Sequence, residues 1–440
     1  MLRTVTLVVV ATLSACTWGG DSNGGNNFSC SAKGQKQFVL STMRRWYLWN
    51  DALPKNVKIG DYDTPQDLLA YLTTFSPDDG TGNPRDIYSY IGSAAADAQY
   101  YAAGQYWGFG FSYESVAAGD ARLLRVFADS PAGLAGLARG QRILELNGRS
   151  IADIEAAEGI DAVLATTPVE FHMQETDGSE FTVPLDQDVV TIDPVPQWRI
   201  IDAGGGRMVG YIELAAFIST ADTRLDDVFT QFEANGITDV ILDLRYNGGG
   251  VVSTAELLAD YLGGLVAENL IFTKTLFNAD RAKNNNRETL FERLGNSIGL
   301  SRLVVIATGN TASASELLTN GMEPHVDVTI VGDRTFGKPV GQIGVEFCGN
   351  VLRATAFQTV NADDFGDFYD GLPPDCPMGD DLSIAVGADN DPNLVVALGY
   401  LASGACPVAG APGGQTKPGP PVPLARKSHG PPWRDYSNAY

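Results

Sequence analysis

Residues 303–318 read LVVIATGNTASASELL: a short apolar run, then small and hydroxyl-bearing residues, then a helical pattern. A strand that continues into a helix in this way is typical of α/β proteins, in which parallel strands alternate with crossover helices. Ligands in such sheets sit at the carboxyl ends of the strands. The stretch therefore predicts an α/β domain and places Ser313 and Ser315 at a candidate site. The alternative is that either serine only caps the helix.

The same alternation runs through residues 191–406, which we expect to form the largest domain. It predicts four strands, at 209–214, 239–244, 303–307 and 328–331, and three helices, at 225–233, 255–262 and 315–322. Such an order favours a largely parallel sheet covered by helices.

Two smaller units precede this region. Residues 31–104 are expected to form a small helical region, with one helix starting at the capped sequence Asp63-Thr64-Pro65. Residues 105–190 are expected to be mostly β. Their elements are a strand at 123–127, a short helix at 130–137, a strand between turns at 140–148 and a hairpin around 177–178.

Composition excludes several classes of function. The chain has 440 residues, of which 44% are hydrophobic, and a formal net charge of −23. The acidic balance argues against nucleic acid or an anionic membrane surface as the main partner, because both are bound by basic patches. Three His and no CxxC pattern leave no plausible zinc site, and we expect no cofactor. The oligomeric state stays open.

The amino terminus has the form of a secretory signal. Residues 1–15 combine an early Arg3, an apolar stretch and small residues before Cys16. The sequence LSAC at 13–16 is similar to a bacterial lipobox, which predicts a lipid on Cys16, a flexible tether at 17–30 and a lipoprotein on the periplasmic side of the cell envelope. The alternative is an ordinary signal peptide. Residues 407–440 are a Pro/Gly-rich tail that we expect to be disordered.

Export permits disulfides among the other cysteines. Cys30, Cys348, Cys376 and Cys406 form an even set with three possible pairings. A Cys348–Cys376 bond would close a loop inside one domain, and a Cys30–Cys406 bond would tie the two ends together. The sequence does not choose between the pairings, or between disulfides and buried thiols.

A serine nucleophile needs a base. His325 is expected beyond the end of the 315–322 helix, about 15 Å from Ser313 at the helical rise per residue. Lys338, in the sequence TFGKP at 335–339, follows the next strand and can return to the same sheet edge. It can act as a base only if burial lowers its pKa from about 10.4 towards neutrality. The alternative is a solvated surface lysine.

A buried-looking strand at 239–244 runs into Arg-Tyr-Asn and then three glycines at 248–250. Glycines at this place allow a substrate backbone to approach closely and let amides turn towards it. The alternative is a tight turn that binds nothing.

Taken together, these segments resemble peptidase family S41, the carboxyl-terminal processing or tail-specific serine proteases. The matching motifs are TASASE at 311–316, TFGKP at 335–339 and DLRYNGGG at 243–250, with departures at Thr311, Pro339 and the Tyr-Asn-Gly segment. The resemblance implies an endopeptidase with a crotonase/ClpP-like α/β catalytic core.

Residue roles follow from the same resemblance. It implies that Ser313 is the nucleophile, that Lys338, 25 residues further on, is the general base, and that Gln342 supports the lysine. The backbone amides of Ala314 and Gly249 would form the oxyanion hole.

The resemblance also extends to residues 105–190, which look like the PDZ domain of these proteases. Gly108, Phe109, Gly110 and Phe111 match the loop whose amides bind a peptide's terminal carboxylate. Protein or peptide substrates are the implied partners. Two alternatives stay open: an inactive PDZ-containing scaffold lipoprotein, and an acyl-CoA-type hydrolase or isomerase of related fold.

Overall fold

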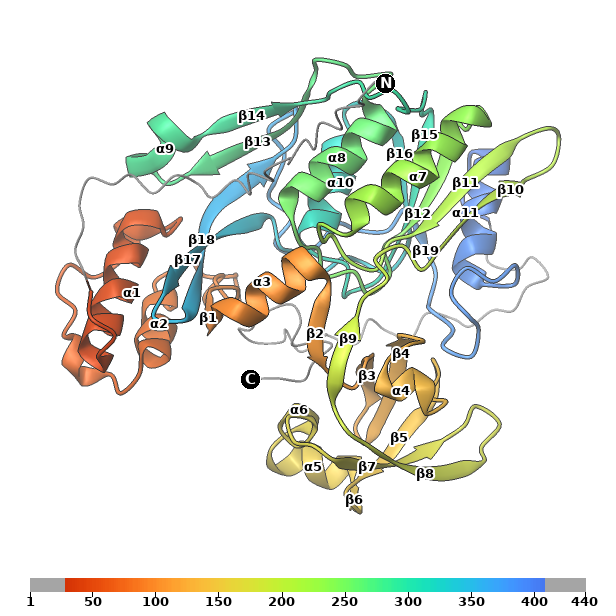
Figure 1. The fold of residues 1–440 in the computed structure, drawn as a ribbon. Helices are drawn as coiled ribbons and strands as arrows, with labels where there is room; N and C mark the ends of the chain where they lie inside the picture. The colour runs from red at the N-terminus through yellow and green to blue at the C-terminus, as the bar shows by residue number, and fades with distance from the viewer. Residues whose placement is uncertain (1–27, 408–440) are drawn as a thin grey trace, which may run out of the picture.

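A computed structural model describes residues 28–407 of the chain. The expected signal peptide, Cys16, most of the tether and almost all of the tail lie outside the described residues. Figure 1 shows three parts: an N-terminal helical region, a β-rich unit at the bottom of the view, and a larger α/β part between and above them.

The α/β part is built on a six-stranded sheet. All neighbouring strands from β11 onward are parallel, and only the edge strand β10 is antiparallel. The order is β10 (Gln197–Asp202), β11 (Met208–Glu213), β12 (Asp239–Asp243), β15 (Arg302–Ala307), β16 (Asp327–Gly332) and β19 (Cys376–Pro377). The four predicted strands and the largely parallel sheet are therefore confirmed.

Helices cover both faces of this sheet (Figure 1). One face packs against α7 (Ala221–Ala234), α8 (Val252–Gly263) and α10 (Ala314–Met322), and the other against α11 (Pro392–Ser403). Within β12, Leu242 faces the first helix layer and Ile241 the second. Successive side chains of a strand point to opposite faces, so a sheet buried on both sides needs the continuous apolar runs found in the sequence.

A second sheet, which the sequence did not predict, joins the α/β part to the N-terminal region. Its central strand β18 (Asn350–Val360) pairs with three others, all antiparallel. The members are β1 (Tyr90–Ser93), β17 (Val340–Phe347), β13 (Ile271–Phe277) and, beyond β13, the edge strand β14 (Arg287–Leu290); α9 (Ala279–Asn285) follows β13.

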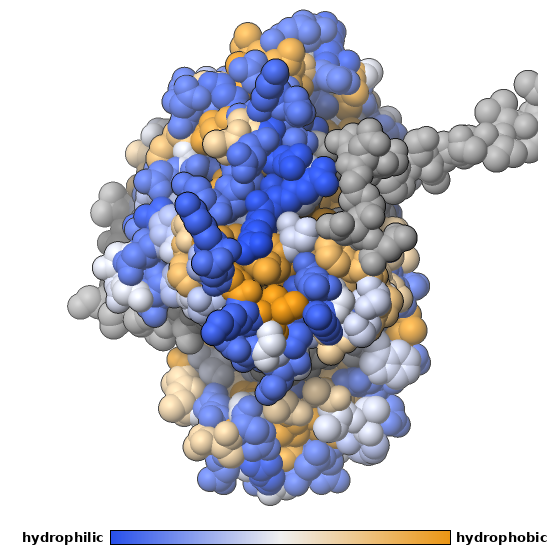
Figure 2. Space-filling view, turned by 90° about the vertical axis from the view of Figure 1, so that its left-hand side faces the viewer, coloured by the Kyte–Doolittle hydropathy of each residue, from blue (hydrophilic) through white to orange (hydrophobic). Residues whose placement is uncertain are grey.

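The N-terminal region packs on this second sheet. It contains α1 (Ala32–Trp46), α2 (Pro65–Thr73), α3 (Ala94–Ala103) and two 3₁₀ turns, Asn50–Ala52 and Ile59–Asp61. The capped start predicted for α2 is confirmed, because Thr64 accepts from the Asp67 amide and Pro65 is the first helical residue. Figure 2 views the molecule from this side. Polar side chains cover most of that face, and apolar ones gather near its middle.

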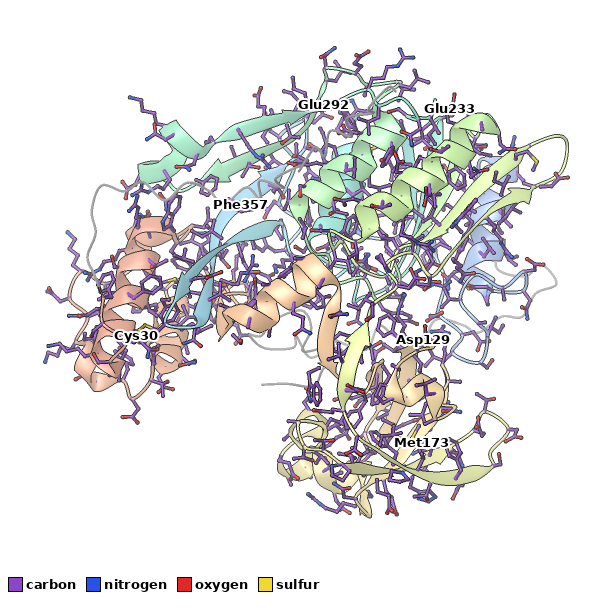
Figure 3. The ribbon with its side chains drawn as sticks, in the orientation of Figure 1. Cys30, Asp129, Met173, Glu233, Glu292 and Phe357 are labelled. Atoms are coloured by element: carbon purple, nitrogen blue, oxygen red, sulfur yellow. A yellow bond between two sulfur atoms is a disulfide. The ribbon has the colours of Figure 1, made fainter. Side chains whose placement is uncertain are left out.

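The β-rich unit hangs from the rest through β2 (Gln105–Gly108) and β9 (Asp188–Thr191), which pair with each other. Its core contains the side chains of Phe109, Phe111 and Met173, the last of which is labelled in Figure 3. The other elements are β3 (Phe111–Ala117), β4 (Asp120–Val126), α4 (Pro131–Leu134), β5 (Arg142–Leu146), β6 (Arg149–Ser150), α5 (Ile151–Ala157), α6 (Ile160–Leu164), β7 (Val169–Gln174) and β8 (Glu180–Leu185).

Two disulfides tie distant segments. Cys30, labelled in Figure 3 beside α1, is bonded to Cys348 in the turn between β17 and β18. Cys376 of β19 is bonded to Cys406 after α11. The two bonds considered from the sequence, Cys348–Cys376 and Cys30–Cys406, are wrong. The second sheet carries the β17–β18 turn to the N-terminal region, whereas the end of α11 returns beside β19. No helix of residues 28–407 is long and apolar enough to cross a membrane.

Candidate active site

The predicted nucleophile lies on a strained turn between β15 and α10. Ser313 has φ 58° and ψ −111°, a conformation that a residue with a side chain rarely adopts. It is partly exposed, whereas every other residue of 311–322 is buried. Strain of this kind persists only where the surroundings enforce it, and it concentrates at functional sites. The turn therefore presents one hydroxyl to the outside.

The alternative serine is structural. Ser315 is fully buried, and its hydroxyl donates to the carbonyl of Asn247 at 3.0 Å. The amide of Ala312 donates to the same carbonyl at 3.0 Å, and the Thr311 hydroxyl donates to the carbonyl of Leu244 at 2.7 Å. These bonds hold the serine turn against the end of β12 and leave Ser313 as the accessible candidate.

The glycine turn after β12 lies directly against this serine. A Cβ built on Gly249 would come within 2.7 Å of the Ala314 nitrogen and 2.8 Å of the Ser313 Cβ, so only glycine fits. However, the amide of Gly249 donates to the Asn247 side chain at 2.9 Å. The Gly249 amide is therefore engaged inside its own turn, and its role as an oxyanion donor, which would need this contact to open, stays a prediction. Gly249 also allows the close approach of the two turns.

The amide of Ala314, the other predicted oxyanion donor, lies at the start of a helix. Ala314 is the first residue of α10, and the first amides of a helix have no partner within the helix. The positive end of the helix dipole adds to the attraction for a negative oxygen at this point.

Lys338 lies in the loop between β16 and β17 and points to Gln342. Its ammonium nitrogen is 3.0 Å from Oε1 of Gln342. Gln342 in turn donates to the carbonyl of Tyr88 at 2.5 Å. Burial lowers the pKa of Lys338 to about 8, against the opposing charges of Asp86 and Glu316. These surroundings do not fit the alternative of a solvated surface lysine, because burial lowers the pKa of Lys338 far enough for some neutral amine to be present near neutral pH.

A buried carboxylate joins the serine turn to the lysine loop. Oε2 of Glu316 accepts from the backbone amides of Ser313 at 2.9 Å and Lys338 at 2.8 Å. Oε1 accepts from the amide of Gly337 at 2.7 Å and the hydroxyl of Thr335 at 2.5 Å. Because the amides of Ser313 and Lys338 share the acceptor Oε2, their nitrogens are no further apart than the sum of those two hydrogen-bond distances.

The role of Glu316 was not predicted from the sequence. The spacing Ser-x-x-Glu does signal a capping box, in which the glutamate reaches back to the cap residue. Nothing local in the sequence shows that the same carboxylate also reaches the loop at 335–338.

A cluster of buried charges lies at the start of the glycine turn, around Arg245. Arg245 is buried and paired with Asp243, Asp391 and Asp380 at 2.6, 2.5 and 2.9 Å. Burial opposes its charge, but the carboxylates outweigh this effect and raise the pKa of Arg245. Buried charges are normally paired in this way, and loss of one partner is costly.

The β-rich unit reaches the same turn through two arginines. Arg125 of β4 pairs with Glu213 at the end of β11 at 2.9 Å and donates to the Arg245 carbonyl at 3.2 Å. Arg139 donates to the hydroxyl of Tyr246 at 2.8 Å and pairs with Asp380 at 2.7 Å. The unit is therefore in contact with the backbone next to the candidate site.

The histidines lie elsewhere. The ring of His325 contacts the carbonyl of Ile271 at 2.8 Å, beyond the end of α10, as the helix geometry predicted. His172 lies in the β-rich unit between Glu145 and Glu180. His429 lies outside the described residues. No group of His, Cys, Asp and Glu within 28–407 is arranged to hold a metal ion.

Family models match two parts of the chain. The model of peptidase family S41 matches residues 208–378, and the model of the peptidase S41 N-terminal domain matches residues 34–90. Together they span more than half of the sequence. The chain belongs to peptidase family S41. The first of these regions holds the serine turn, the glycine turn and the lysine loop, so all three predicted motifs lie in the peptidase part of this S41 chain.

Curated relatives agree with this assignment. A carboxyl-terminal-processing protease of Picosynechococcus sp. is 28% identical over 285 residues, which cover 62% of this chain and 64% of that protein. A chloroplastic C-terminal processing peptidase of Tetradesmus obliquus is 26% identical over 291 residues, which cover 62% of this chain and 59% of that protein. The S41 chain thus matches less than two thirds of the length of these relatives.

Solved structures show the same fold. A putative S41 protease from Bacteroides fragilis has a TM-score of 0.65 at 23% identity and covers 83% of this chain and 97% of its own. A photosystem II D1 C-terminal processing protease has a TM-score of 0.52 at 21% identity, with 80% and 94% covered. The S41 chain shares the fold of these two proteins. At this level of identity, a shared fold does not show a shared activity.

Proposed function

We propose that this S41 chain is a serine endopeptidase with a Ser–Lys dyad. Neutral Lys338 takes the proton of the Ser313 hydroxyl as the oxygen attacks the peptide carbonyl. The leaving amine receives that proton, and water then hydrolyses the acyl-enzyme. The observation that carries this proposal is the strained, accessible Ser313, whose backbone amide shares one Glu316 oxygen with the amide of Lys338, a lysine of lowered pKa.

The oxyanion of the tetrahedral intermediate would be held by the amide of Ala314 at the start of α10. One such donor is typically worth about 2.7–4 kcal/mol in the transition state. We also propose a crotonase/ClpP-like core, which is supported by the parallel sheet with a reactive group at its carboxyl edge. Against the inactive-scaffold alternative, the serine, the lysine and the glutamine are all present, and the lysine ammonium contacts the glutamine.

Covalent labelling tests the proposal directly. We expect a fluorophosphonate to label the full-length protein once, and we expect Ser313→Ala to abolish labelling and the cleavage of an unstructured protein. Ser315→Ala is the matched control, because it removes a hydroxyl from the same turn that is buried and already bonded. Wild-type labelling that persists in Ser313→Ala would overturn the mechanism.

We propose further that the β-rich unit is a PDZ domain that recognises the C-terminal end of substrates. The carbonyl of Phe109 accepts from Ala132, and that of Gly110 accepts from Phe127. Because a trans peptide unit points its N–H opposite to its C=O, the amides of Gly110 and Phe111 face away from that segment. Gly110 has φ 93°, and a Cβ there would lie 1.9 Å from Ser130. These features support a backbone loop that binds a carboxylate, with both phenylalanine rings serving the core.

A pair of peptides tests this recognition. A peptide substrate with a free C-terminal carboxylate should have a KM about tenfold or more below that of its C-terminal amide, since a hydrogen bond to a charged group is worth about 1.5–3 kcal/mol. N-terminal acetylation of the same peptide is the control and should leave KM unchanged. Equal KM values for acid and amide would contradict carboxylate capture.

We propose that the protein is exported and acts on the periplasmic side of a bacterial cell envelope, anchored by a lipid on Cys16. Two disulfides support an oxidising compartment, because such bonds are rare in the reducing cytosol. Cys16 and the segment before it lie outside the described residues.

A further inference from the structure

Tyr88, just before β1 in the N-terminal region, makes three separate contacts with the lysine loop and the start of β17. Its carbonyl accepts from Gln342 at 2.5 Å, and its hydroxyl donates to the carbonyl of Gly337 at 2.8 Å. Its ring centroid lies 5.3 Å from the Lys338 nitrogen. One buried residue therefore touches the proposed base, the residue before it and the glutamine that binds it.

Asp86 fixes the backbone that carries this tyrosine. The carboxylate is fully buried and accepts from the amides of Tyr88 and Ser89, each at 3.0 Å. It also accepts from the hydroxyls of Ser89 at 2.6 Å and of Thr355, on β18, at 2.9 Å. All four donors are neutral, so the carboxylate is tied to the turn and to β18 while its charge acts on its surroundings.

We propose that Tyr88 and Asp86 are positioning residues for the Lys338 base. The N-terminal region is then part of the active site rather than a packing unit alone. Tyr88 shields the Lys338 amine from water and orients Gln342. Asp86 holds Tyr88 in position, and the negative charge of Asp86 favours the protonated amine. This inference rests on the proposed function.

The charges around Lys338 set the direction of each effect. Burial lowers its pKa to about 8, Asp86 and Glu316 of α10 oppose that change, and Arg353 of β18 adds to it. Removing the ring of Tyr88 admits water and weakens the effect of burial, which we expect to outweigh the lost attraction between ring and ammonium, so the pKa of Lys338 rises. Removing the charge of Asp86 lowers the pKa. The two substitutions should act in opposite directions.

The test is the rate of fluorophosphonate labelling of Ser313 as a function of pH, in the full-length protein. In this reaction the Ser313 oxygen bonds to phosphorus, the P–F bond breaks, fluoride leaves and Lys338 takes the hydroxyl proton. We expect the midpoint of the profile to move up by about half a pH unit or more in Tyr88→Ala and down by a similar amount in Asp86→Asn. Tyr88→Phe keeps the ring and should keep the midpoint.

Tyr71→Ala is the matched control, because Tyr71 belongs to an aromatic cluster of the same region with Tyr62 and Phe75, and should leave the midpoint unchanged. Thermal melting identifies variants that fail to fold. If either Tyr88→Ala or Asp86→Asn fails to fold, the midpoint of the remaining variant tests the inference. Unchanged midpoints, or shifts in the direction opposite to those stated, would overturn the inference. A wild-type protein that is not labelled at all would overturn the proposed function instead.

Discussion

Replacing Lys338 by alanine or by arginine should reduce the turnover of a peptide substrate by about 10³-fold or more at pH 7, in line with the contribution of general bases. Alanine removes the proton acceptor. Arginine keeps the positive charge but stays protonated at all accessible pH values, so it cannot accept a proton. The equal loss in the two variants separates a base from a residue that acts only by its charge.

The same lysine predicts the pH dependence of the wild-type enzyme. Its pKa is lowered to about 8, and only the neutral amine can take the Ser313 proton. The value of kcat/KM should therefore rise with pH through about 8 and level off above it. At pH 7 about a tenth of the molecules would carry the neutral form.

Lys36 offers a matched control, since it is a buried lysine of α1 whose ammonium contacts the Tyr62 carbonyl at 2.5 Å, away from the site. Lys36→Ala should lower the melting temperature but keep the pH profile. Wild-type turnover in Lys338→Arg at pH 7 would refute the role of Lys338 as the base.

Glu316→Gln should lower kcat by about 10²-fold with little change in KM, the effect expected when catalytic groups are misplaced by about 1 Å. Each oxygen of Glu316 accepts from two donors, and glutamine has only one oxygen. In either orientation its NH₂ group faces the backbone amide of Gly337, or those of Ser313 and Lys338. At least one buried amide loses its acceptor, which also costs about 1–3 kcal/mol of stability.

The separate effect on rate distinguishes Glu316 from a purely structural carboxylate. Asp239→Asn is the control, because Asp239 is buried and paired with Arg302, but at the opposite end of β12 from the glycine turn. It should lower the melting temperature and leave kcat of the folded protein unchanged. If kcat of Glu316→Gln equals that of the wild type, the carboxylate does not align the serine and the lysine.

The central sheet was predictable because its signals are local. β12 and β15 are continuous apolar runs, and only strands covered on both faces require such runs. The second sheet was not predictable in the same way. β17 shows no regular alternation of buried and exposed residues along its length. Its partner β18 also pairs with β1, which lies more than 250 residues earlier in the chain. Pairing over that separation leaves no periodic signal in either segment.

In the candidate site, too, residues in local motifs were predictable and residues that act through distant contacts were not. Ser313, Lys338 and Gln342 stand in recognisable motifs, and the structure brings their segments together. The surroundings of the Gly249 amide depend on one side chain, since the Asn247 carboxamide turns back onto that amide in the folded chain. The contributions of Glu316 and Tyr88 escaped detection because each depends on a contact made by the folded chain with a distant loop.

The contact between Tyr88 and Gln342 joins residues 254 positions apart, and the Cys30–Cys348 bond spans 318. During synthesis the N-terminal region emerges long before the strand that completes its sheet. Contacts of such separation form late, because the intervening chain must first be ordered. The surroundings of the proposed proton acceptor would thus remain incomplete while the nascent polypeptide is most open to attack. The topology of the chain would in this way limit self-digestion during biogenesis.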